Sequence, residues 1–303
     1  MKDFTNKTST FFLLHATVLV LGFTGILGKL ISLETAELVW YRLLIATIAM
    51  FIILSIRKKK FILSPKNTLL FLGIGIIVGL HWFCFFESIK SANVSVALGC
   101  LASQSLFTSF LEPIIHKKKL LWFDVLTGIL ILGGLYIIFQ FETSFIKGIT
   151  YGIMAAFLAS LFSVLNDKHA KKEIAVNIMT FYEMLGGFIG VNILFLFIGE
   201  KLALHPIHFE GYDLLYLLIL GIVCTAGAFV LIIDLIKRLG AFTVLLAINL
   251  EPVYGILAAF LIFGDSEKMT VGFYIGALII IIAVFLHPFF SKRIRKKAAI
   301  MKA

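Results

Sequence analysis

The chain has 303 residues, of which 60% are hydrophobic and 15% are charged, and its mean hydropathy is +1.05. A soluble fold of this size cannot bury so much apolar surface, so the composition excludes a soluble protein and indicates several membrane spans. The net charge of +10 does not indicate nucleic-acid binding, because the lysines and arginines occur in short clusters between apolar runs.

Apolar runs long enough to cross a bilayer recur along the whole chain. A helix needs about 20 apolar residues to span a hydrocarbon core of roughly 30 Å. On that rule we predict an all-α polytopic membrane protein with ten transmembrane helices, joined by connections too short to form another domain. The predicted spans lie near residues 10–30, 35–56, 67–89, 93–115, 120–140, 147–167, 174–198, 212–236, 241–263 and 270–290. The first run lacks a signal-peptide cleavage site, so we expect it to remain as a helix.

Basic residues predict the orientation of these helices. The runs RKKK (57–60), KKK (117–119) and KRIRKK (292–297) lie in even-numbered connections or near the C-terminus, together with most of the 27 lysines and arginines. Few basic residues lie in the odd-numbered connections. Because basic connections tend to stay in the cytoplasm, the pattern predicts that both termini are cytoplasmic.

The two halves of the sequence resemble each other. FFESIK (85–90) aligns with IIDLIK (232–237), and SVALG (95–99) aligns with TVLLA (243–247). The shared order of such matches indicates a five-helix unit that is present twice. Five is an odd number, so the second unit must cross the membrane in the opposite sense. Inverted repeats are typical of secondary transporters, which hold their substrate near the midplane between the repeats.

The same features resemble a known family. The duplicated five-helix unit, VWYRLL (39–44) and RLGAFTVLLAINLEPVYGILAAFLIFGD (238–265) are similar to the EamA family of the drug/metabolite transporter superfamily. The resemblance implies a bacterial inner-membrane permease that uses alternating access to carry a small metabolite, such as an amino acid or related amphiphile, usually as an exporter. It also implies one repeat over residues 1–140, a second over 147–290, and a basic cytoplasmic tail over 291–303.

Glu251 and Pro252 lie near the centre of the ninth predicted helix. A carboxylate at that depth usually faces a cavity or a partner, and proline breaks the hydrogen bonding of the helix beside it. We interpret Glu251, Asn249 and Tyr254 as substrate-binding residues. Glu251 is then either a contact for a substrate amine or the group that couples transport to protons. A hydrogen-bonded structural glutamate is the alternative.

The duplication places Ser103 and Gln104 of the fourth helix opposite this site. They form hydrogen bonds but do not change charge, so the predicted cavity has one neutral half, which suits a zwitterionic or amphiphilic solute. The family commonly has a fourth-helix proline to match Pro252, and Gln104 stands in its place here. His81 and Trp82 complete the predicted substrate-binding set. A packed, hydrogen-bonded histidine is the alternative for His81.

Four further charges are predicted to act in gating or in structure. Arg42 interrupts VWYRLL, and Glu183 interrupts the similar TFYEML (180–185) at a depth that differs by about 5 Å. The two form an ion pair only if their helices meet; otherwise Arg42 extends towards the interface or meets backbone carbonyls. Glu87 and Asp234 each precede a lysine by three residues near a helix end, which is typical of interfacial anchors. Matching gate charges are the alternative.

Other patterns have weaker meanings. Glycines spaced four apart at 75/79, 186/190 and 272/276 favour close helix contacts, within the chain or in a homodimer. The three cysteines have no metal-site or disulfide spacing, and no nucleotide motif occurs, so we predict no cofactor or metal and no enzymatic activity. A membrane-embedded enzyme acting on a lipid or lipid-linked sugar is the alternative function. It would need acids or histidines clustered at one interface, where the sequence has only scattered ones.

Overall fold

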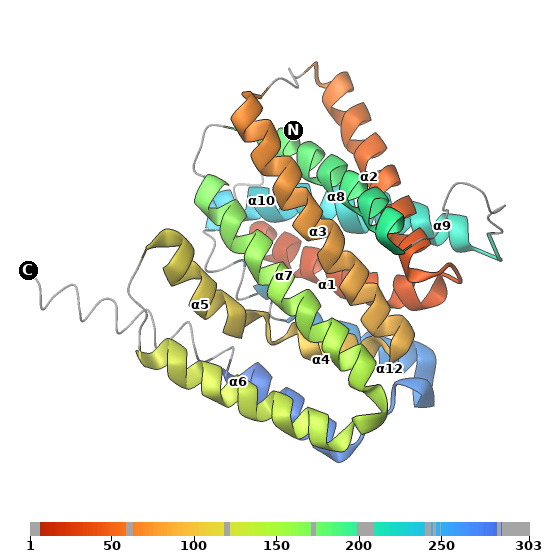
Figure 1. Ribbon diagram of the computed structural model, residues 1–303, viewed down its shortest axis with the longest axis vertical. Coiled ribbons are helices and arrows are strands. Elements are labelled where there is room, and N and C mark those ends of the chain that lie inside the picture. The colour runs from red at the N-terminus through yellow and green to blue at the C-terminus, as the bar shows by residue number, and fades with distance from the viewer. Residues whose placement is uncertain are drawn as a thin grey trace, which may run out of the picture.

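The computed structural model describes residues 7–58, 63–117, 122–170, 174–198, 209–239, 244, 247–248, 250–283 and 286. This part of the chain is almost entirely helical and has no β-strand, which confirms the predicted all-α class. In Figure 1, α3 and α7 run side by side from the upper left to the lower right, α8 lies in the upper part of the view, and α6 lies along the lower edge beside the last helix.

The helices fall into two halves along the chain. The first half contains α1 (Lys7–Leu30), α2 (Thr35–Ile56), α3 (Pro65–Ser91), α4 (Val94–Leu101), α5 (Gln104–His116) and α6 (Trp122–Phe141). The second half contains α7 (Ile146–Ala170), α8 (Val176–Ile198), α9 (Asp213–Leu218), the π-helix η2 (Ile219–Gly227), α10 (Ala228–Leu239), α12 (Glu251–Phe263) and a last helix over Val271–Ala283. Two short 3₁₀ turns are η1 (Thr143–Phe145) and η3 (Gly264–Glu267).

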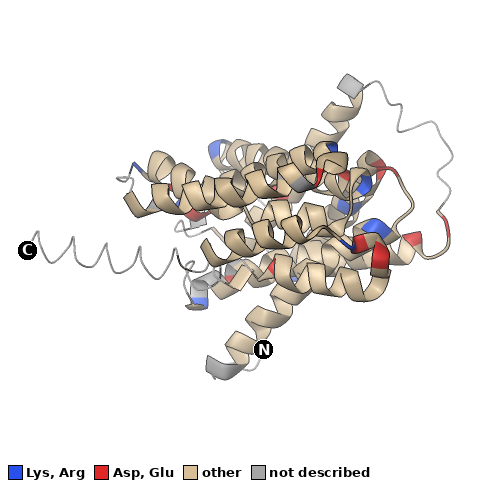
Figure 2. Cartoon of the chain, turned by 90° about the horizontal axis from the view of Figure 1, so that it is seen from below, with Lys and Arg blue, Asp and Glu red and all other residues tan. Residues whose placement is uncertain are grey.

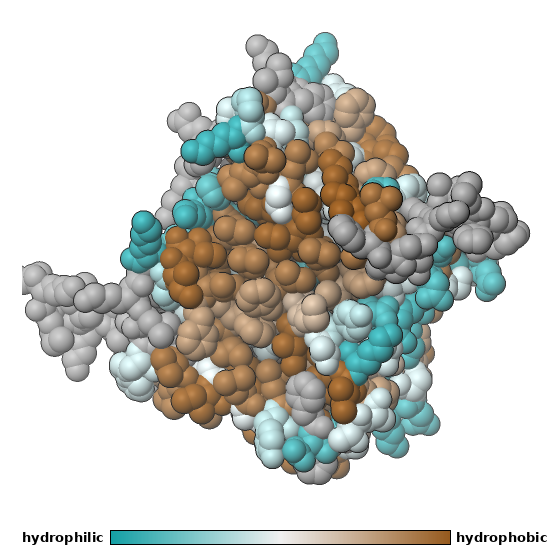
Figure 3. Space-filling model, viewed as in Figure 1, coloured by the Kyte–Doolittle hydropathy of each residue, from teal (hydrophilic) through white to brown (hydrophobic). Residues whose placement is uncertain are grey.

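Among the described residues, seven helical stretches are long and apolar enough to cross a membrane, and two shorter apolar helices accompany them. Each predicted span overlaps one or more of the described helices. Of the ninth predicted span, 241–263, the structure describes mainly α12. Large apolar side chains such as Phe12, Leu196 and Leu261 lie at least 75% exposed on the outer surface. Apolar residues also dominate the face seen in Figure 3, and charged residues lie mostly towards helix ends in Figure 2. Such a surface is suited to lipid.

The helices of the fourth and ninth spans begin anew at matching positions. α4 ends at Leu101 and α5 begins at Gln104, and α12 begins at Glu251 after a turn at Leu250. The Cys100 carbonyl oxygen, near the end of α4, accepts from both the hydroxyl and the N–H of Ser103, at 2.6 and 3.0 Å. Pro252 lies in the first turn of α12, where its missing N–H breaks no helical hydrogen bond. The interruption therefore comes just before Glu251, whereas the sequence suggested a bend within a continuous helix.

Glycines bring helices from the two halves into close contact. A Cβ on Gly75 of α3 would lie 2.1 Å from the carbonyl oxygen of Glu183 on α8. A Cβ on Gly186 of α8 would lie 2.2 Å from the carbonyl oxygen of Leu72 on α3. Gly134 of α6 and Gly276 of the last helix approach each other in the same way. These glycines therefore pack helices within one chain, which answers a question that their spacing left open.

Contacts between helices follow the duplication. α1 packs against α12 in the second half, and its counterpart α7 packs against α4 and α5 in the first half. The equivalent helices α2 and α8 also meet directly, and α4 of the fourth span packs against α12 of the ninth. This arrangement places the boundary between the two halves at the centre of the bundle.

Candidate functional site

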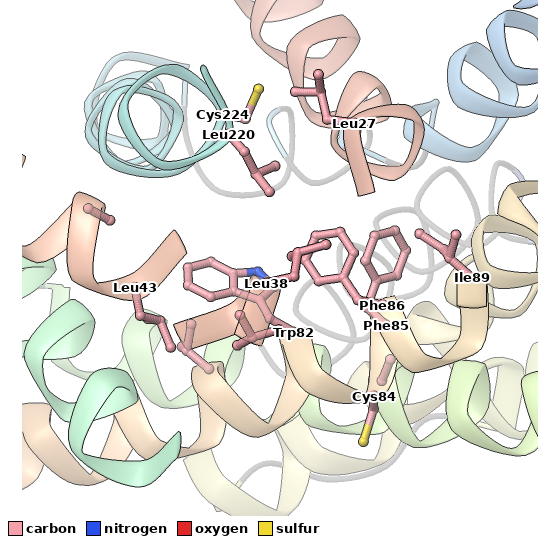
Figure 4. Close-up of a cluster of buried hydrophobic side chains, with 14 of the residues drawn as sticks. Leu27, Leu38, Leu43, Trp82, Cys84, Phe85, Phe86, Ile89, Leu220 and Cys224 are labelled. Carbon is pink, nitrogen blue, oxygen red and sulfur yellow. The ribbon is translucent and has the colours of Figure 1, made fainter. Parts of the chain in front are cut away.

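A cavity of about 180 Å³, here called the central cavity, lies between the two halves. Its wall is mainly apolar and aromatic, with Trp82 and Phe85 from α3, Phe162 from α7 and Phe229 from α10. Figure 4 shows Trp82 and Phe85 pointing from α3 towards the helices that carry Leu27 and Leu220. The volume is smaller than the roughly 300–1,000 Å³ of pockets that hold drug-sized ligands, so the cavity suits a small metabolite.

Arg42 of α2 contributes a positive charge to this wall. The residue is 2% exposed, its Nε donates to Thr225 Oγ1 at 2.7 Å, and its guanidinium carbon lies 3.9 Å from the centre of the Trp82 ring. Stacking of this kind contributes about 2 kcal/mol when desolvated. The Nη1 nitrogen is buried and has no hydrogen-bond partner in the described part of the protein. A buried charged donor without an acceptor is costly, so Nη1 is available to an anionic group in the cavity.

The π-helix η2 positions the partner of Arg42. The Thr225 hydroxyl accepts from Arg42 Nε and donates to the Leu220 carbonyl oxygen at 2.7 Å, five residues back along the widened turn. π-helical turns are rare and occur frequently at functional sites. Nothing in the apolar run ILGIVCTAG (219–227) indicated this turn or the role of Thr225.

Glu251 contributes a negative charge to the same cavity. It lies in the first turn of α12, where the helix dipole favours an anion. Within the residues that the structure describes, its carboxylate has no hydrogen-bond or ion-pair partner. The charges of Arg42 and Glu251 act on each other, but no ion pair within 4.0 Å joins them. The cavity thus presents a cation and an anion that are both available to a third group.

One end of the bundle is held by polar contacts between the two halves. Glu267 is 1% exposed, accepts from Lys29 Nζ at 2.7 Å, and accepts from the Ser95 N–H at 2.8 Å in the first turn of α4. Asp213 accepts from both the N–H and the hydroxyl of Ser32 at the connection between α1 and α2. The sequence analysis did not single out Glu267 or Asp213, because their partners lie far away along the chain.

The wall of the central cavity reaches the surface near the other end. Asp167 of α7 lines the cavity, and its side chain is 42% exposed. One of its oxygens lies 3.2 Å from His116 Nε2 at the end of α5. The structure therefore has a fastened end and an end at which the cavity approaches the surroundings.

Comparison with known proteins decides the family. The family model described as "EamA-like transporter family" matches residues 8–140 and again residues 146–287. The chain belongs to the EamA-like transporter family. This membership confirms the family predicted from the sequence and makes the chain a polytopic membrane transporter.

No curated protein matches this EamA chain. Among solved structures, one titled "Crystal structure of protein" matches with a TM-score of 0.64 and 15% sequence identity. The match covers 94% of the EamA chain and 99% of the other chain. At this identity the likeness shows the fold alone.

Four of the predicted substrate-binding residues of the EamA protein line the central cavity: Glu251, Gln104, His81 and Trp82. His81 Nδ1 lies 2.9 Å from the Ala155 carbonyl oxygen. A carbonyl oxygen only accepts, so Nδ1 donates and the ring is packed and hydrogen-bonded.

Two other predicted substrate-binding residues, Ser103 and Tyr254, lie outside the cavity. Ser103 is fully buried and bonded to the Cys100 carbonyl, and Tyr254 lies with its hydroxyl 3.2 Å from His15 Nδ1. Neither lines the cavity. Asn249 lies outside the described residues.

The structure separates Arg42 from Glu183. Arg42 bonds to Thr225, whereas Glu183 Oε2 accepts from Asn166 Nδ2 at 3.2 Å, so the two charges do not form an ion pair. Asn166 lines the cavity and was not singled out from the sequence. Its signal was only that of a polar residue near the end of a span.

The interfacial charges have partners other than the lysines three residues on. Glu87 accepts from Lys147 Nζ and from the Thr35 hydroxyl, both at 2.7 Å, and so joins α3 to α7 and α2. Asp234 pairs with Arg238 one turn along its own helix at 2.7 Å, and both side chains are partly exposed.

Proposed function

We propose that this EamA protein is a secondary transporter that exports a small zwitterionic metabolite, of the amino-acid class, across the bacterial inner membrane by alternating access. One observation carries the proposal: Arg42 Nη1 and the Glu251 carboxylate, of opposite charge and without direct partners among the described residues, face one small cavity.

The chemistry of an α-amino acid fits this arrangement. Its carboxylate would accept from Arg42 Nη1, and its ammonium group would donate to Glu251. Charge-assisted hydrogen bonds of both kinds are stronger than neutral ones. An apolar side chain of the substrate would lie against the aromatic wall formed by Trp82, Phe85 and Phe162. A neutral sugar would leave Arg42 and Glu251 without an oppositely charged partner.

The distribution of charges supports a conformation whose cavity faces the cytoplasm, from which an exported substrate would enter. The cavity reaches the surface at Asp167, and the next basic residue, Lys168, belongs to the set of even-numbered connections that the sequence predicts to be cytoplasmic. In this orientation the conformation is open towards the cytoplasm, and the contacts of Glu267 and Asp213 hold the outer end together. Both termini are then cytoplasmic.

Counterflow in proteoliposomes tests the proposal. Vesicles loaded with unlabelled amino acid should take up the labelled amino acid saturably, and should fail to take up its methyl ester or the corresponding decarboxylated amine. Glu251→Gln should raise the half-saturating concentration. Asp234→Asn makes the same chemical change at a side chain paired with Arg238 outside the cavity, and it should transport as the unaltered protein does. Equal uptake of the amine and the amino acid would contradict the proposal.

A further inference from the structure

Glu183 of α8 and Asn166 of α7 form a polar pair that the proposed substrate contacts do not use. Glu183 is 0% exposed, and Asn166 lines the central cavity. Asn166 Nδ2 donates to Glu183 Oε2 at 3.2 Å. The remaining oxygen of each group, Glu183 Oε1 and Asn166 Oδ1, is buried and has no hydrogen-bond partner in the described part of the protein.

Hydrogen-bond accounting points to a proton at this pair. If Glu183 is a carboxylate, both partnerless oxygens are acceptors and neither can satisfy the other. A proton on Oε1 turns that oxygen into a hydrogen-bond donor. The amide oxygen of Asn166, which already donates to Glu183 through its nitrogen, is then an acceptor for it. The pair then forms the two-bond ring that a carboxylic acid makes with an amide. The same proton removes a buried charge, which is otherwise costly to hold away from water.

No positive charge among the described neighbours of Glu183 stabilises its carboxylate in place of a proton. α8 packs against α2, α3 and α10, and within the described residues no charged group acts on Glu183. The ionisable groups in the interior or near the inner ends of these elements and α7, and on α8 beside Glu183, include Arg42, Arg57, Lys66, His81, Asp167, Lys168, His169, Tyr182, Asp234 and Arg238. None of them is among the groups that act on Glu183. Arg42 is bonded to Thr225, His81 to Ala155, Asp167 to His116, and Asp234 to Arg238. In the described part of the chain, Glu183 therefore has no cationic partner to hold it as an anion.

We propose that Glu183 and Asn166 form a proton-binding site of the transporter, separate from the substrate contacts at Arg42 and Glu251. The inference rests on the proposed function, because a bound proton drives transport only in a carrier. Asn166 lies on the cavity wall, so water in the cavity reaches the pair from one side of the membrane. The acid and the amide belong to different helices, so a movement of α7 relative to α8 opens the ring, hydrates the carboxyl group and releases the proton.

Infrared difference spectroscopy on the purified, reconstituted protein tests the bound proton without any transport assay. At neutral pH the unaltered protein should show a carboxylic-acid carbonyl band that is absent from Glu183→Gln. Asp234→Asn should keep that band, because Asp234 is partly exposed and forms an ion pair with Arg238. Should Glu183→Gln fail to fold, Asn166→Leu keeps the acid but removes the ring, and should shift the band to higher frequency. A spectrum unaffected by both variants would overturn the proposal.

Transport tests the coupling. The amide of Glu183→Gln can both donate to and accept from Asn166, so it mimics the protonated acid. We expect this variant to retain counterflow and to lose the extra accumulation that a pH gradient drives in the unaltered protein. Accumulation that still follows the gradient in Glu183→Gln, or that ignores the gradient in the unaltered protein, overturns the proton site. Absence of counterflow in the unaltered protein would instead contradict the proposed function.

Discussion

Replacing Arg42 by methionine separates the two roles that its sequence position allows. In one, the guanidinium holds the fold together through Thr225 and Trp82. In the other, it binds the carboxylate of the substrate through Nη1. Methionine fills a similar volume, makes favourable contacts with an aromatic ring, and removes the charge. Thr225 still donates to the Leu220 carbonyl oxygen, so Arg42→Met leaves no buried hydroxyl donor without an acceptor.

The contacts of Arg42 allow the energetic effect of the substitution to be estimated for both roles. Arg42→Met loses a hydrogen bond to a charged group, about 1.5–3 kcal/mol, and a desolvated cation–π contact, about 2 kcal/mol. It also removes the desolvation cost of a buried ion, which is several kcal/mol, so the net change in the free energy of unfolding should be small. A substrate that loses one charge-assisted hydrogen bond of about 1.5–3 kcal/mol should bind about 10- to 150-fold more weakly.

The assay combines thermal unfolding in detergent with the half-saturating concentration for counterflow. We expect Arg42→Met to keep its Tm within a few degrees and to raise the half-saturating concentration by at least about tenfold. The double variant Arg42→Met/Glu251→Gln restores the charge balance of the cavity, and we expect no recovery of affinity in it. A marked fall in Tm with unchanged affinity would refute the reasoning and assign Arg42 to the fold. Full recovery in the double variant would show that only charge balance matters.

Two further predictions concern the packing of the bundle and its fastened end. Gly75→Ala places a methyl group against the α8 backbone and should lower the free energy of unfolding by about 1–3 kcal/mol or more, whereas Gly73→Ala on the same helix meets no atom within 4 Å and should be neutral or stabilising; thermal unfolding distinguishes them. Equal effects of the two alanines would contradict the close approach of α3 and α8. Glu267→Gln leaves the buried contact with Lys29 uncompensated and should cost about 3–5 kcal/mol, whereas Asp265→Asn, with its side chain 96% exposed, should leave Tm unchanged. A Glu267→Gln variant as stable as Asp265→Asn would show that the fastened end of the bundle does not depend on this contact.

Composition and periodicity were sufficient to predict the overall architecture. Long apolar runs have few alternatives in a bilayer, because every backbone polar group in lipid must be bonded within a helix or closed barrel. The interruptions were harder to predict. Pro252 indicated an interruption in the ninth span, but no proline lies beside the matching start of α5 at Gln104. At the interruption between α4 and α5, the Ser103 hydroxyl bonds to the Cys100 carbonyl oxygen. Serine also occurs in many uninterrupted helices, so it does not by itself predict an interruption.

The site was predictable only as far as the residue types were unusual for a membrane. Arg42, Glu183 and Glu251 stood out because ionisable groups are rare at such depths. Their partners did not stand out, because Thr225 and Asn166 are ordinary polar residues whose importance comes from helices that meet in space. The similar phrases around Arg42 and Glu183 suggested a direct pair, whereas the fold gives each charge a different neighbour.

The separation of these charges would allow one small cavity to serve the two proposed ligands, a substrate and a proton. An ion pair between Arg42 and Glu183 would occupy some of the N–H donors of Arg42 and the oxygens of Glu183. Instead Arg42 keeps Nη1 for the cavity, Glu251 keeps its carboxylate, and Glu183 lies apart beside Asn166 with one oxygen without a partner. Each unanswered group is costly in an empty protein, so each favours the state in which its ligand is bound. The substrate and the proton would then act on different helices, α2 and α12 for the one and α7 and α8 for the other, and coupling between them would depend on how these helices move together.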